Sequence, residues 1–148
     1  RRVLFRSLAS GDHVAGNLLT MAWIGLANLA AATGDLPAAH AAFVAAREPT
    51  AAWAERFPEL PWALRLLAIL EHGLGCVAEE LAADAALPAP ERMAHLEGAH
   101  AAFTRGQETA ERLAAAGRLR GADAAMPKLF ALDAQRVART LAEQQASK

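Results

Sequence analysis

Apolar and polar positions along most of this chain repeat with the period of an α-helix rather than that of a strand. Within residues 62–86, for example, Leu66, Leu70 and Leu74 return every four residues, and residues 91–113 carry a similar apolar stripe. This spacing places the apolar side chains on one face of an amphipathic helix. Alanine is abundant, tyrosine is absent and β-branched residues are few, which also favours helix. We therefore predict an all-α fold.

The stretch from residue 20 to residue 51 predicts two short antiparallel helices joined by a tight turn. Gly34 suits the left-handed residue that ends a helix, and Asp35 can cap the helix that follows. Pro37 is tolerated in the first turn of that helix, where its missing N–H is not needed. The apolar residues that share one face are Trp23, Leu26, Ala27 and Ala30 in the first helix, and Ala39, Phe43 and Ala46 in the second. We expect Phe43 to fill the seam between the helices, near Trp23.

The same residues resemble the tetratricopeptide repeat (TPR), a unit of 34 residues with the pattern W-x2-L-G-x2-Y followed by A-x3-F. The matching segments are Trp23-x2-Leu26-Ala27-x2-Ala30 and Ala39-x3-Phe43. The departures are Ala27 in place of glycine, Ala30 in place of tyrosine, and an early Pro49. The resemblance covers one unit, at about residues 20–53. It implies a TPR-like α-solenoid fragment of antiparallel helical hairpins that binds a protein or peptide and is not an enzyme.

The resemblance also implies a binding surface. In TPR proteins the first helix of each unit lines the concave groove, and asparagines on this helix often hold the backbone of the bound peptide. The residues on the corresponding face here are Asn17, Met21, Ile24 and Asn28. The alternative is that a neighbouring helix covers this stripe. The expected partner is a protein, a peptide or another domain of a larger bacterial regulatory or scaffold protein, and no cofactor is expected.

Prolines divide the chain after this hairpin. Pro49, Pro58 and Pro61 predict that the second helix ends near Ala46 and that residues 50–57 form at most one short helix. The aromatic residues expected to cover the open end of the hairpin are Trp53, Phe57 and Trp62.

The remaining chain predicts longer helices in one domain. They are expected over residues 62–86, from residue 91 to Gly117, and from Met126 onward. Their apolar stripes include Phe103 in the second and Leu129 and Phe130 in the third. The total is five or six helices over residues 8–148, with the TPR-like hairpin at 12–57 and longer helical hairpins at 62–145.

The first seven residues, RRVLFRS, resemble a translated sequencing adapter and are not preceded by an initiator methionine. We therefore treat residues 1–7 as a non-native segment, and we expect the helix to start near Asp12 and the natural N-terminus to belong to a longer parent protein. Without Arg1, Arg2 and Arg6 the basic residues fall from 15 to 12 against 16 acidic residues, so the remainder has a formal charge of −4. This mildly acidic balance does not favour nucleic-acid binding.

Two further observations concern location. Cys76 is the only cysteine, so no internal disulfide is expected and a reducing, cytoplasmic compartment fits best. Residues 14–34 carry no charged side chain, and this run is long enough to span a bilayer. Polar residues such as Asn17 and Asn28, and the many alanines, argue against insertion. A membrane-associated helical protein is therefore a second alternative, and self-association is expected if the run is exposed.

Several residues between 72 and 100 could ligate a metal. The candidates are His72, Cys76, Glu80, His95, Glu97 and His100. Glu97 and His100 have the Glu-x-x-His spacing of di-iron bundles, but such a site needs a second pair and two further glutamates. The main alternative function is thus a self-contained bundle that holds a metal or a small apolar ligand. Because the ligand set is incomplete, and no phosphate loop, HExxH or G-x-S-x-G motif occurs, we predict no metal site and no catalytic residue.

Overall fold

The computed structural model describes residues 2–146, and it describes residues 2–13 by their backbone alone. The α-helices are α1 (Arg2–Ala32), α2 (Leu36–Arg56), α3 (Pro61–Ala83), α4 (Ala89–Ala115) and α5 (Met126–Ala146), with a short 3-10 helix η1 (Gly121–Ala125) before α5. Residues 2–146 contain five α-helices and no strand, so the predicted all-α fold of five or six helices is confirmed at this level.

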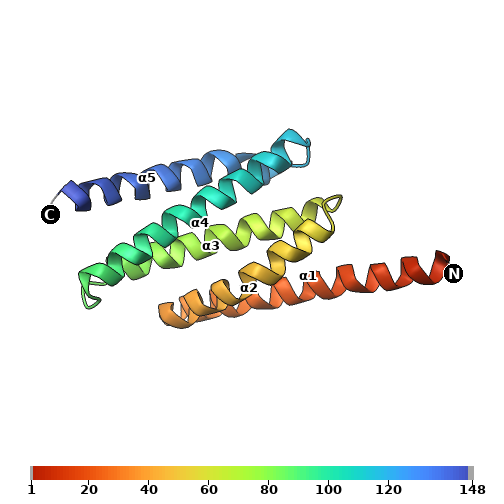
Figure 1. The fold of residues 1–148 in the computed structure, drawn as a ribbon, viewed down its shortest axis with the longest axis horizontal. Helices are drawn as coiled ribbons and strands as arrows, with labels where there is room; N and C mark the ends of the chain where they lie inside the picture. The colour runs from red at the N-terminus through yellow and green to blue at the C-terminus, as the bar shows by residue number, and fades with distance from the viewer. Residues whose placement is uncertain (1, 147–148) are drawn as a thin grey trace.

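Each helix packs mainly against its neighbours in the chain. The helices α3 and α4 share the largest contact, α2 packs on both α1 and α3, and α5 packs on α4. The helices consequently follow one another from α1 to α5 across the molecule (Figure 1). The first and last helices, α1 and α5, form the two ends of this array, and each has one principal neighbour.

The turn between α1 and α2 has the predicted geometry. Gly34 has a φ of 82°, in the left-handed region that glycine adopts without strain. The side chain of Asp35 caps α2, because its Oδ1 accepts a hydrogen bond from the backbone N–H of Ala38 at 3.0 Å. Gly117, with a φ of 65°, similarly follows the end of α4. These local signals therefore predicted the ends of α1 and α4 correctly.

The predicted break in the second helix is wrong. A proline in a helix interior removes one backbone hydrogen bond and costs about 3 kcal/mol, yet α2 continues through Pro49 to Arg56. Beyond the proline, α2 buries Thr50 and Trp53, and the hydroxyl of Thr50 lies 3.1 Å from that of Thr20 on α1. The packing of this last part of α2 against α1 therefore outweighs the cost of the proline, and the separate short helix over residues 50–57 does not form.

Two other helix predictions need correction. The helix expected to start near Asp12 begins at Arg2, because α1 runs without a break through residues 2–32. The side chains of residues 1–7, the segment interpreted as non-native, lie outside the described residues. Leu26 and Leu129, both expected on packed faces, are more than half exposed, because the neighbouring helices lie on other sides of α1 and α5.

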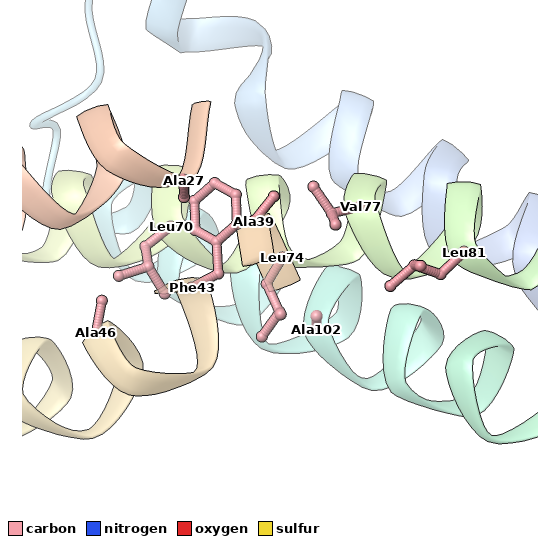
Figure 2. Packing of buried hydrophobic residues seen from close by; sticks show 9 residues of the cluster. All are labelled: Ala27, Ala39, Phe43, Ala46, Leu70, Leu74, Val77, Leu81 and Ala102. Atoms are coloured by element: carbon pink, nitrogen blue, oxygen red, sulfur yellow. The ribbon is translucent and has the colours of Figure 1, made fainter. Parts of the chain in front are cut away.

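The main core cluster joins four helices around Phe43. Its buried members are Ala27, Ala39, Phe43, Ala46, Leu70, Leu74, Val77, Leu81 and Ala102. Figure 2 shows these side chains, which come from α1, α2, α3 and α4. As predicted, Trp23 packs against the cluster that contains Phe43. Apart from Phe43, four of the eight other members of this cluster are alanines. The ring of Phe43 therefore supplies much of the volume that fills the cluster.

Aromatic residues also cover the other end of the first hairpin. Trp53 and Phe57 form a second buried cluster with Leu66, and the half-buried Trp62 packs against it. The rings of Trp53 and Trp62 lie 4.6 Å apart between centroids. The predicted aromatic cover is therefore confirmed.

Glycines on α3 allow the helices to approach closely. A Cβ atom added to Gly73 would lie 2.6 Å from Cζ of Phe43. A Cβ atom added to Gly75 would lie 2.6 Å from Cε1 of Phe103, on α4. Both distances are shorter than any normal contact, so each aromatic ring occupies the space that a side chain would take.

We expect Gly73→Ala to destabilise the protein by about 1–3 kcal/mol, because the new Cβ atom would overlap the ring of Phe43, which is buried and must shift. Gly98→Ala is the control, since a Cβ atom there meets nothing within 4 Å. Replacing a helical glycine of that kind should instead stabilise by about 0.5–1 kcal/mol. Urea unfolding measures both. Equal stability of the two variants would contradict the packing of Phe43 against Gly73.

We expect Pro49→Ala to raise the free energy of unfolding. The substitution restores a helical N–H and removes the clash of the proline ring, which together stabilise the helix by about 3 kcal/mol. The unfolded chain also gains conformational freedom, which offsets about 0.4–1 kcal/mol of this gain. Residue 49 is exposed, so no packing is lost. Pro37→Ala, in the first turn of α2, is the control and should have little or slightly negative effect. Loss of stability in Pro49→Ala would show that the proline supports α2.

Candidate functional site

The side of α1 that points away from α2 is apolar and open to solvent. Its residues, which we call the outer face of α1, are Val14, Leu18, Met21, Ala22, Gly25 and Leu29. Val14, Leu18, Met21 and Leu29 are each more than half exposed. A Cβ atom added to Gly25 would meet nothing within 4 Å. The exposed side chains of Leu19 and Leu26 extend this surface along one edge. The result is one continuous apolar strip.

The structure divides the predicted peptide-binding residues between this surface and the core. Met21 and Asn28 are exposed, and Met21 belongs to the outer face of α1. Asn17 is half-buried. Ile24 is also half-buried and packs against both the Phe43 cluster and the Trp53 cluster. The exposed strip is therefore centred on Leu18 and Leu29, which the sequence pattern did not single out, rather than on Ile24.

The opposite side of α1 is closely packed on α2. Thr20 is buried and its hydroxyl lies 3.1 Å from that of Thr50. A Cβ atom added to Gly16 would overlap the indole of Trp53. The α1–α2 seam thus combines small residues with one large ring, as the seams on α3 do.

One segment in the described part of the chain passes a simple test for a membrane span. Val14–Ala32 has 19 residues and a mean hydropathy of 1.4, and 11% of it is buried. Signal sequences and the core helices of soluble proteins share this length and composition, so these features alone do not assign the segment to a membrane.

A polar cluster joins α3 to α5 and contains a cysteine, a histidine and a carboxylate. Nε2 of His72 lies 3.0 Å from a carboxylate oxygen of Asp133, and its ring stacks on Phe130 with 4.6 Å between centroids. Sγ of Cys76 lies 3.8 Å and 3.9 Å from the two ring nitrogens of His72. Asp133 in turn accepts a hydrogen bond from Arg136 at 2.6 Å.

This geometry does not activate the thiol. A base that takes the proton of a cysteine needs one nitrogen lone pair directed at the sulfur, whereas Cys76 is equally far from both nitrogens of His72. Burial, followed by the negative charges of Asp133, Glu79 and Glu80, raises the pKa of Cys76 to about 11. The thiol is therefore protonated at neutral pH, and the cluster is a structural contact between α3 and α5.

The candidate metal ligands do not converge. Among the described residues no group of three or more histidine, cysteine, aspartate or glutamate side chains could hold a metal ion. Glu80 is exposed, and His95 packs edge-to-face against His40 with 5.3 Å between centroids. Glu97 is exposed as well. Among these candidates, His72 and Cys76 lie within contact distance of each other, with Sγ of Cys76 at 3.8 Å from Nδ1 of His72.

The most buried charge in the described structure is Glu71, on α3. Its side chain is nearly inaccessible and accepts three hydrogen bonds from two arginines on neighbouring helices. Nε of Arg47 donates to it at 2.8 Å, and Nε and Nη2 of Arg105 donate at 3.0 Å and 2.8 Å. This triad was not predicted from the sequence, although one signal was present: Glu71 lies in the apolar stripe of its helix, next to Leu70 and one turn before Leu74.

Comparisons with protein-family models, with curated proteins and with solved structures find no match for this chain.

Cys76 should react slowly with iodoacetamide. A pKa raised from 9.0 to about 11 lowers the thiolate fraction at pH 7.5 roughly 100-fold relative to an unperturbed cysteine. Mass spectrometry at timed intervals measures the rate, and the same protein in urea, where burial is lost, is the control. Native alkylation as fast as that of the unfolded protein would mean that Cys76 is not held by α3 and α5 as described.

Proposed function

We propose that this protein is a non-catalytic helical binding module, and that the outer face of α1 binds an amphipathic helix of a protein partner. The observation that carries the proposal is the exposed, uncharged surface at one end of the array. An apolar strip of this kind on a soluble protein marks an interaction site. The resemblance of residues 20–53 to a TPR unit supports the same class of function, because TPR proteins bind proteins and peptides.

The exposed side of α5, at the other end of the described array, is more polar than the outer face of α1. The exposed side of α5 carries Leu129 and Leu132, but also Lys128, Gln135 and Arg139. In helical arrays the terminal unit needs a polar outer face for solubility. The last helix, α5, meets this condition and α1 does not. The apolar strip on α1 is therefore a surface suited to contact with a further element.

A helix is the partner that this surface fits best. The outer face of α1 sets the small residues Ala22 and Gly25 between the larger Leu18 and Leu29. The established seams of the protein use the same combination, with Gly73 opposite Phe43. Small residues let the backbones of two helices approach, and larger ones fill the grooves on either side. A partner helix would pack on α1 as α2 does on its other side.

A bilayer fits less well. The helix α2 lies against α1, and the hydroxyls of Thr20 and Thr50 meet in their seam. The exposed residues of α2 include Glu48 and Glu55. If α1 crossed a membrane in this arrangement, those charges would enter the hydrocarbon, at about 2.5–3.5 kcal/mol for each charge at the centre. The charges of α2 thus favour a protein partner over a membrane span.

The test is selection of binders from a displayed library of amphipathic helical peptides, followed by measurement of affinity for surface variants. Leu18→Glu and Leu29→Glu should each weaken the binding of the selected peptides by at least about 10-fold, because both place a charge in the buried contact. Leu132→Glu is the matched control, since Leu132 is exposed to a similar degree at the other end of the array. The Leu132→Glu variant should bind the selected peptides with unchanged affinity.

Three outcomes would overturn the proposal. Selected peptides that bind Leu18→Glu and Leu29→Glu normally would place binding elsewhere. If the protein floats with vesicles of phosphatidylcholine and phosphatidylglycerol and Leu18→Glu does not, the outer face of α1 binds a membrane instead. A dimer in sedimentation equilibrium that Leu18→Glu converts to a monomer, with no peptide selected, would show that a second copy covers the face.

A further inference from the structure

A groove of about 430 Å³ lies between α2 and α4, on the side of the protein where α3 forms its floor. Arg47 and Arg105 line it, together with His40 from α2 and His95 from α4. Leu74 and Ala78 of α3 also belong to the lining. The volume falls in the range of small-molecule sites. This site shares no residue with the outer face of α1, and the inference drawn from it does not depend on the proposed protein partner.

One end of the groove carries surplus positive charge. Two guanidinium groups meet the single carboxylate of Glu71, and one would suffice to neutralise it. Glu71 is not part of the lining, whereas both arginines are. Arg47 donates to Glu71 only through Nε, and Arg105 leaves its Nη1 unused, so three guanidinium nitrogens of the pair carry no hydrogen bond to another described residue. These donors suit the oxygens of a carboxylate.

The other end of the groove is closed by the two histidines. Their rings meet edge-to-face with 5.3 Å between centroids. Burial, and to a smaller extent the charge of His95, lowers the pKa of His40 below its ordinary value of 6.5. The lowered pKa favours the uncharged form of His40, so this end of the groove attracts an anion less strongly than the arginine end does. Arg47 follows His40 by two turns of α2, so the two ends are about 10 Å apart.

The middle of the groove is apolar. Apart from the arginines and histidines, the lining residues are Val44, Leu74, Ala78, Ala94, Gly98 and Ala101. A charged head group and an apolar body can consequently be bound together, each by a different part of the groove. The geometry points to a small linear organic acid as the ligand, with its carboxylate on Arg47 and Arg105 and its hydrocarbon chain over Leu74 toward the histidines. A chain of about eight carbons spans the distance between the two ends.

Octanoate is the probe, and isothermal titration calorimetry is the measurement. Binding of octanoate with a dissociation constant of about 1 mM or tighter is expected, and 1-octanol, which has the same chain without the charge, should bind at least about 10-fold more weakly. N-acetyl-leucyl-leucine distinguishes a free acid from the carboxyl end of a peptide. Tighter binding of the peptide than of octanoate would reject a small organic acid as the ligand.

Two variants locate the site. Arg47→Gln removes the surplus charge and leaves Arg105 on Glu71, so it should weaken octanoate at least about 10-fold without unfolding the protein. Gly98→Leu places a side chain in the groove from a position with open space, keeps both arginines, and should block binding of octanoate. Arg139→Gln, an exposed arginine on α5, is the charge-matched control and should bind normally.

The remaining outcomes would overturn the inference. Equal affinity for octanoate and octanol would leave only a non-specific apolar surface. Equal weakening by Arg47→Gln and Arg139→Gln would show a general charge effect rather than a site. Unchanged binding in Gly98→Leu, with the fold intact by circular dichroism, would place octanoate outside the groove, and no detectable binding of octanoate would reject the inference altogether.

Discussion

The buried carboxylate of Glu71 is the constraint on which the arrangement of the three central helices depends. A carboxylate that is 2% exposed would destabilise the fold by several kcal/mol if it were left unpaired. Arg47 of α2 and Arg105 of α4 both reach it, so sliding either helix along α3 would break a charged hydrogen bond. Apolar packing between alanine-rich helices tolerates small shifts, whereas this triad does not. It therefore fixes the register that places His40 opposite His95 across the groove.

Close approach of the helices is the second condition, and it depends on a few positions without a side chain. The helix α3 lies between α2 and α4, and it presents Gly73 to Phe43 and Gly75 to Phe103. Each ring fills the gap at a glycine, which lets an alanine-rich sequence reach the packing density of a normal core. The same logic operates at Gly16 and Trp53 between α1 and α2. Aromatic rings therefore lie opposite glycines between α1 and α2, between α2 and α3, and between α3 and α4.

Features that depend on local chemistry could be predicted from the sequence, whereas features that depend on contacts between distant residues could not. The turn at Gly34 and Asp35 was predictable because both residues act on their own backbone. The continuation of α2 through Pro49 was not, because its cause is the packing of Thr50 against Thr20, thirty residues away. Leu26 was assigned to the wrong side of α1 for the same reason. Periodicity shows which residues share a helix face, but it does not show which face a neighbouring helix covers. The groove required knowledge that α2 and α4 both lie on α3, which no short motif records.

The two proposed sites are physically separate although both involve α2. One side of α2 meets α1 through Thr50, and another side directs His40 and Arg47 into the groove. The outer face of α1 points away from α2, so a helix bound to it would leave the groove open. The chemistry of the sites also differs, since one is uncharged throughout and the other is organised around a pair of arginines. Salt should therefore weaken a ligand at the groove by screening, while apolar association at α1 should persist or strengthen.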